Sequence, residues 1–78
     1  MKASWQGELL KVRRKALGLK MEEVSVKIGC TRPIVSMWEN GKASPSGHFL
    51  VLLGLVLGCH PHEFYKVEGP DVDEATQK

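Results

Sequence analysis

The sequence has 78 residues, 42% of them hydrophobic and 26% charged, which is the composition of one small globular domain. A chain of this length buries only about 60% of the surface that it exposes when unfolded, so we expect a thin core that gains from a partner. The net charge is +2, but residues 1–42 carry nine Lys and Arg against four Glu, whereas residues 43–78 carry two Lys against five acids. This asymmetry favours a nucleic-acid partner over a membrane surface.

The sequence predicts a protein of the reducing cytoplasm. No apolar run precedes residue 49, so no secretory signal is expected. The most apolar stretch, 49–57, is too short to span a bilayer, and no membrane partner is predicted. Cys30 and Cys59 do not form the pattern of a disulfide framework.

The first predicted element is an amphipathic helix over residues 6–17, ended by Gly18. Its inward face is predicted to be apolar and to consist of Leu9, Val12, Ala16 and Leu17. Its outward face is predicted to be basic and to carry Lys11, Arg14 and Lys15.

Two short helices follow, separated by a glycine. The first is predicted over residues 21–28, with carboxylates in its first turn that suit the helix dipole. Gly29 then breaks the chain, and Thr31 is a suitable N-cap for a helix that runs to Glu39. Val35 and Trp38 are predicted to point into the core from this helix.

A fourth helix is predicted over residues 47–57, after Ser46 and before Gly58, and a short fifth helix over residues 61–66. No strand pairing is expected. From Val67 onward the chain is acidic and almost without large apolar side chains. We therefore predict one domain over residues 1–66 and a disordered tail over residues 67–78.

The two short helices around Gly29 have the ingredients of a helix-turn-helix, which places its second helix in the major groove. The residues around them, above all the run Trp38-Glu39-Asn40-Gly41-Lys42, resemble the lambda-repressor-like (Cro-like, xenobiotic response element) family over about residues 8–66. The resemblance implies an all-α fold of five helices, with the motif at helices two and three. It also implies a homodimer that binds double-stranded DNA at pseudo-palindromic operators.

The resemblance also implies roles for single residues. The positions expected to face base edges are Arg32, Pro33, Ser36 and Met37. The positions expected to contact phosphates are Thr31, Asn40 and Lys42, together with Lys20 as a point charge where the family has a cap followed by Gln. Arg13 and Glu39 match a family ion pair that joins the first helix to the end of the third.

The fourth predicted helix is apolar on nearly all sides, which is hard to leave in water on the outside of a small domain. We expect a subunit interface there, formed by Phe49, Leu52, Leu55 and Val56, with Tyr65 contributing. The alternative is that the domain wraps this helix within itself.

Neither a metal site nor catalysis is expected. The run Cys59-His60-Pro61-His62 matches no strong zinc spacing, and no nucleophile has a plausible base beside it. No cofactor and no small-molecule ligand are predicted. The predicted function is a sequence-specific, dimeric transcriptional repressor. The alternative is a protein-interaction module, such as an antitoxin or adaptor, that uses the apolar fourth helix.

Overall fold

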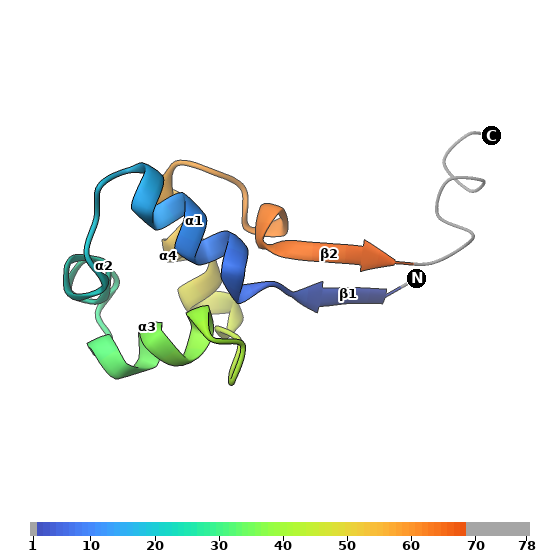
Figure 1. Cartoon of the computed structure of the whole chain (residues 1–78), viewed down its shortest axis with the longest axis horizontal. Coiled ribbons are helices and arrows are strands. Elements are labelled where there is room, and N and C mark those ends of the chain that lie inside the picture. Colours follow the sequence, from blue (N-terminus) through green and yellow to red (C-terminus); the bar gives the residue numbers. More distant parts are fainter. Residues whose placement is uncertain (1, 69–78) are drawn as a thin grey trace.

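A computed structural model describes residues 2–68 of the chain. The elements, in order, are β1 (Lys2–Trp5), α1 (Gly7–Ala16), α2 (Met21–Ile28), α3 (Arg32–Glu39), α4 (Gly47–Leu57), the single 3-10 turn η1 (Pro61–Phe64) and β2 (Tyr65–Glu68). The helices pack into one body, and the two strands pair into a ribbon that extends from it (Figure 1). The helical fold is confirmed, but within the described residues it has four α-helices and a two-stranded sheet in place of five helices.

The core receives side chains from every helix. Each of its members is nearly or fully buried: Leu10, Val24, Ile28, Val35, Trp38, Leu53, Leu57 and Phe64. The predicted inward residues of α3, Val35 and Trp38, are confirmed, and their i, i+3 spacing places them on one side of the helix. Trp38 is a core residue, in contact with the half-buried ring of Phe49 at a centroid distance of 5.7 Å.

The predicted inward face of α1 is wrong. Leu10 and Arg14 face the core, whereas Leu9 is 41% exposed and Val12 and Leu17 are exposed too. The cause is Gly7, which lies one turn before Leu10 against the end of α3. A Cβ at Gly7 would overlap the carbonyl oxygen of Trp38. This close approach sets the rotation of α1 and turns a charged side chain, Arg14, inward.

The turn between α2 and α3 depends on Gly29, whose φ of 83° lies in the left-handed region. Side chains rarely adopt this conformation, so glycine permits the abrupt change of direction. The N–H of Gly29 still donates to the Ser25 carbonyl at 2.9 Å. The turn therefore ends α2 without leaving this donor unpaired.

The predicted fifth helix is also wrong. It stops after one 3-10 turn at Phe64, and Tyr65 begins a strand that runs antiparallel to β1, with Trp5 opposite Tyr65 and Lys2 opposite Glu68. Aromatic contacts favour this strand, because the Trp5 ring lies 5.9 Å from Phe64 and 5.6 Å from Tyr65.

The predicted tail begins too early, because Val67 and Glu68 belong to β2. The rest of that prediction, residues 69–78, lies outside the described residues. Within residues 2–68, none of the helices has the length and apolar character needed to cross a bilayer.

Candidate nucleic-acid interface

The helix α3 is buried on one side and open to solvent on the other. Val35, Trp38 and Glu39 are buried, whereas Arg32 and Met37 are exposed. The inward residues anchor the helix to the core and leave its outer side free. A helix held in this way can enter the major groove of DNA while its buried contacts with the core stay intact.

The four predicted base-facing residues occupy this outer side. Arg32, Pro33 and Met37 are exposed, and Ser36 is half-buried. The sequence reasoning missed Ile34, an exposed apolar residue at the edge of the same side. The helical period gave no signal for it, because it lies four residues before the buried Trp38 and would be placed on the inward side.

Ser36 and Asn40 are joined by a hydrogen bond along the outer side of α3. The amide Nδ2 of Asn40 donates to Oγ of Ser36 at 3.3 Å. This arrangement leaves the hydroxyl proton of Ser36 and the amide oxygen of Asn40 available for other partners. A residue predicted for phosphate contact thus orients one predicted for base contact.

The predicted phosphate-contacting residues lie at the ends of the two motif helices. Thr31 and Lys20 occupy the N-cap positions of α3 and α2, and Asn40 and Lys42 follow the last turn of α3. Their side chains are all exposed. The backbone N–H of Lys20 donates to a carboxylate oxygen of Glu23 at 2.7 Å, which replaces part of the missing cap.

The predicted ion pair between Arg13 and Glu39 is wrong by one residue. Arg14 makes this pair: Nη2 donates to Oε1 of Glu39 at 3.0 Å, Nε donates to Oε2, and Nη1 donates to the Leu19 carbonyl at 2.7 Å. The hydrogen bond to Glu39 is the main cause that raises the pKa of Arg14 above its usual value. The pair ties α1 to the last turn of α3.

Arg13 serves another helix. Its Nε donates to the Leu57 carbonyl at 3.1 Å and its Nη2 to the Gly58 carbonyl at 3.0 Å. These are carbonyl groups at the C-terminus of α4, where a cation also suits the helix dipole. The adjacent arginines therefore hold two different helices against α1.

The end of α3 receives a third support from β1. The indole Nε1 of Trp5 donates to the carbonyl oxygen of Trp38 at 2.8 Å. The same carbonyl faces Gly7 across the close approach described above. The strand, α1 and the end of α3 thus meet at one backbone group.

The outward side of α4 is the second exposed feature. Leu55 is 74% exposed and Val51 is exposed, whereas Phe49, Leu52 and Val56 are half-buried. Beside Leu55 lies a groove of about 500 Å³ lined by Val51, Gly54, Leu55, Gly58, Cys59, His60, Pro61 and Glu63. We call these exposed and half-buried α4 residues, together with the groove, the α4 surface. Tyr65 lies apart from it in sequence, on β2, in contact with Trp5.

Neither cysteine has the character of a reactive or metal-binding group. Both are half-buried free thiols, and burial raises the pKa of each. Among residues 2–68, no group of three potential metal ligands comes together. His60 and His62 stack on one another at 5.5 Å.

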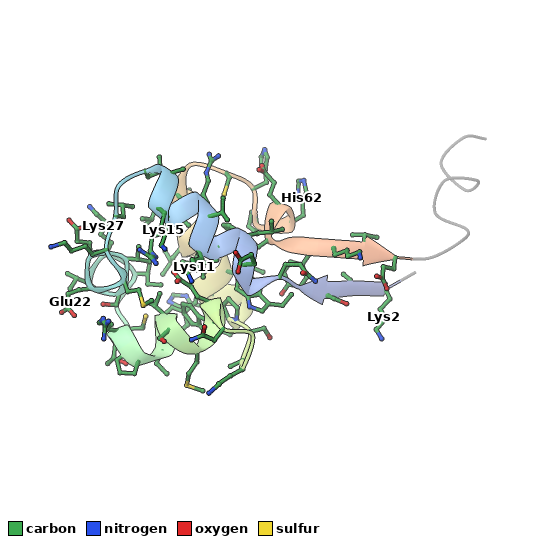
Figure 2. The ribbon with its side chains drawn as sticks, viewed as in Figure 1. Lys2, Lys11, Lys15, Glu22, Lys27 and His62 are labelled. Atoms are coloured by element: carbon green, nitrogen blue, oxygen red, sulfur yellow. The ribbon has the colours of Figure 1, made fainter. Side chains whose placement is uncertain are left out.

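Positive charge is spread over the helical body. Lys11 and Lys15 lie on α1 and Lys27 on α2, whereas Lys2 lies on the ribbon, at its far end (Figure 2). Acidic side chains flank this charge at the start of α2, where Glu22 is exposed. The helical body therefore carries more cations than the ribbon, but its surface is not uniformly basic.

A family model described as helix-turn-helix matches residues 10–64. The repressor protein C2 of Salmonella phage P22 is 29% identical over 66 residues, which cover 85% of this chain and 31% of that protein. The chain therefore spans about a third of the length of this repressor.

Solved structures share the fold. The P22 c2 repressor in complex with a synthetic operator is 31% identical with a TM-score of 0.69, over 70% of this chain and 83% of that chain. The restriction-modification controller protein C.AhdI from Aeromonas hydrophila is 29% identical with a TM-score of 0.69, over 74% and 88%. Hydroxypropylphosphonic acid epoxidase from S. wedmorenis is 29% identical with a TM-score of 0.73, over 87% of this chain and 36% of that enzyme.

Proposed function

Because this chain belongs to the helix-turn-helix family, we propose that it is a sequence-specific transcriptional regulator that reads duplex DNA with α3. The observation that carries the proposal is the one-sided burial of α3, with Val35, Trp38 and Glu39 buried and Arg32 and Met37 exposed. The likeness to a repressor whose structure contains operator DNA supports it. The epoxidase assigns no reaction to this chain, which corresponds to only about a third of that enzyme.

Four side chains read bases in this proposal. Arg32 donates two hydrogen bonds to O6 and N7 of a guanine, which its planar guanidinium matches. Met37 and Pro33 contact thymine methyl groups, and the Ser36 hydroxyl donates to a base acceptor. The Ser36 contact is supported by the hydrogen bond from the Asn40 amide to the Ser36 hydroxyl oxygen, which leaves the serine proton free to be donated.

Phosphate contacts come from the helix ends. Lys20 and Lys42 supply charge, whereas Thr31 and Asn40 supply hydrogen-bonding groups. Such contacts fix the register of α3 in the groove and carry little sequence information. The exposure of all four side chains supports this role.

The chain acts as a homodimer through the α4 surface. Leu55 of one subunit enters the groove of the other, with Phe49, Leu52 and Val56 around it and Tyr65 at the edge. The support is that an exposed leucine and an apolar groove lie side by side, as a self-complementary interface requires. Two-fold symmetry then brings two copies of α3 to successive major grooves, about 34 Å apart.

The base-reading role is tested by selecting bound sites from a random duplex pool at fixed salt. Arg32→Ala should weaken binding by about 5- to 150-fold and relax the preference at one base pair, as expected for loss of about 1–3 kcal/mol. Lys2→Ala, which removes a cation from the far end of the ribbon, should leave the preference unchanged. If Arg32→Ala selects the parent site with the parent preference, Arg32 is not a reading residue.

The dimer is tested by size-exclusion chromatography with light scattering. Leu55→Glu should convert the dimer to a monomer and weaken operator binding, because it places a charge in an apolar interface. Val26→Glu on α2 is the matched control, since Val26 is also highly exposed. A parent chain that is monomeric and selects no duplex would instead support an adaptor that binds other proteins.

A further inference from the structure

Two backbone hydrogen bonds close the end of α3. The N–H of Lys42 donates to the Met37 carbonyl at 2.9 Å, and the N–H of Gly41 donates to the Trp38 carbonyl at 3.2 Å. Gly41 has a φ of 74°, so these contacts form a Schellman motif, in which a left-handed glycine follows the last helical turn. The motif sets the direction in which residues 40–42 leave the helix.

The Trp38 carbonyl in this motif has a second donor. The indole Nε1 of Trp5 donates to it at 2.8 Å, a shorter distance than that from the Gly41 nitrogen. A carbonyl oxygen has two lone pairs, so both donors can bind at once. The backbone of α1 lies against the same oxygen, because a Cβ at Gly7 would overlap it. The indole therefore supplies the second hydrogen bond of an oxygen that is closely surrounded by the protein.

The position of the indole is set by the ribbon rather than by α3. Trp5 lies opposite Tyr65 in the register of the strands, and the N–H of the next residue, Gln6, donates to the Phe64 carbonyl at 2.8 Å. The indole ring also contacts the rings of Phe64 and Tyr65, at distances that favour aromatic pairs. The ribbon therefore presents the indole N–H to α3 as a fixed donor.

We propose that Trp5 is a positioning residue for the phosphate contacts at the end of α3. It acts by holding the turn that carries Asn40 and Lys42, and this inference rests on the proposed function, in which both side chains contact phosphates. A turn that is ordered before binding loses less conformational entropy on the duplex, so its preorganisation raises affinity. Phosphate contacts carry little sequence information. Trp5 therefore raises the strength of binding and leaves the base preference unchanged.

The end of α2 provides an internal comparison. Gly29 also has a left-handed φ, of 83°, and the N–H groups of Gly29 and Cys30 both donate to the Ser25 carbonyl at 2.9 Å. Both of these donors are backbone groups, so this helix end keeps them when the side chain of Trp5 is changed. Loss of the indole N–H should therefore loosen the glycine turn after α3 and leave the glycine turn after α2 as it is.

The first test measures amide hydrogen exchange by NMR in the full chain without DNA. Trp5→Phe keeps an aromatic ring on the ribbon and removes the N–H. Exchange at Gly41 and Lys42 should become faster by about 2- to 12-fold, the range that corresponds to one net hydrogen bond. Exchange at Gly29 should stay as in the parent chain. A second variant, with benzothienylalanine in place of Trp5, has sulfur where the indole has its N–H and should give the same pattern, which separates loss of the donor from loss of ring volume.

The second test compares affinities for the selected duplex in a double-mutant cycle. Trp5→Phe should weaken binding of the parent chain by about 2- to 12-fold, with the base preference unchanged. In a chain that already carries Asn40→Ala and Lys42→Ala, it should change the affinity by less than about twofold, because the contacts that it positions are gone. In a chain that carries Lys20→Ala, at the N-cap of α2, it should weaken binding as much as in the parent.

The proposal is overturned if Gly41 and Lys42 exchange in both variants as they do in the parent, or if Trp5→Phe weakens binding equally with and without the side chains of Asn40 and Lys42. A changed base preference in Trp5→Phe would also overturn it, since Trp5 would then act on the reading side chains. If the parent chain selects no duplex, the proposed function fails, whereas the exchange rates still decide whether Trp5 holds the turn.

Discussion

Arg14 and Glu39 join α1 to the end of α3 through two hydrogen bonds, with only 8% and 1% of their side chains exposed. Removal of one partner leaves the other charge buried without compensation. We expect Arg14→Met to lower the free energy of unfolding by about 3–5 kcal/mol, measured by urea denaturation. Arg13→Met, which removes hydrogen bonds to carbonyls, should cost about 1 kcal/mol.

The double variant Arg14→Met with Glu39→Met should recover much of this loss, because no buried charge then remains. Equal losses for the Arg13 and Arg14 variants would contradict the pairing with Glu39.

The rotation of α1 predicts opposite results for two adjacent leucines. Leu10→Ala should destabilise the fold by about 2–5 kcal/mol, because it opens a cavity in the core. Leu9→Ala should cost less than about 1 kcal/mol, since much of that side chain already meets solvent. Thermal unfolding of the two variants would measure both losses of stability. A larger loss for Leu9→Ala than for Leu10→Ala would contradict the rotation of α1 and support the inward face predicted from the sequence.

Gly7→Ala should be strongly destabilising. A Cβ there would overlap the Trp38 carbonyl oxygen and lie 2.6 Å from that of Glu39, and neither oxygen can move without displacing the end of α3. Gly47→Ala is the control, because nothing lies within 4 Å of a Cβ at that position. It should raise stability by up to about 1 kcal/mol through lower entropy of the unfolded chain. A Gly7→Ala variant as stable as the parent would exclude the close approach of α1 to α3.

A phosphate contact by Lys42 predicts a change in salt dependence rather than in preferred sequence. Lys42→Ala should weaken binding to all duplexes alike and lower the slope of log K against log salt by about 1 for each phosphate that the lysine neutralises. Lys2→Ala should leave the slope unchanged. Titrations at several salt concentrations would measure it, and a changed base preference would assign Lys42 a different role.

Thiol chemistry gives a prediction in pH. Burial raises the pKa of Cys30 and Cys59, so the folded chain holds these protons to higher pH than the unfolded chain does. Alkylation at about pH 8 should therefore be slower in the folded chain than in urea, because the thiolate is the nucleophile. Because the unfolded chain loses these protons at lower pH, the free energy of unfolding should fall as the pH rises above the usual thiol pKa. Equal alkylation rates in the folded chain and in urea would contradict the prediction of slower alkylation in the folded chain.

The helical elements could be predicted because their signals are local. The bounds of α2 and α4 follow from glycines at their ends and from apolar residues at helical spacing. The rotation of α1 could not be predicted, because it depends on the approach of Gly7 to a carbonyl that is distant in the sequence. A pattern of residue types also assigns an arginine to solvent unless its buried partner is known.

The ribbon was missed for a related reason. Strands this short give no reliable period-two pattern, and β1 has its partner near the other end of the described chain. At the candidate interface, the exposure of Arg32, Pro33 and Met37 could be predicted because one helix contains all three, whereas their contacts with bases stay a prediction. The Ser36–Asn40 hydrogen bond and the groove beside Leu55 depend on side-chain geometry, which a pattern of residue types in the sequence does not predict.

The pairing of β1 with β2 also constrains the order of events during synthesis. Residues 2–5 leave the ribosome before the helices do, yet their partner strand follows roughly 60 residues later, and closing a loop of that length has an entropic cost of several RT. The contacts among α1, α2 and α3 are closer in sequence and can form before the ribbon does. Until β2 has been synthesised, the Trp5 indole lacks its contacts with Phe64 and Tyr65. A nascent chain truncated before residue 64 would therefore keep β1 exposed.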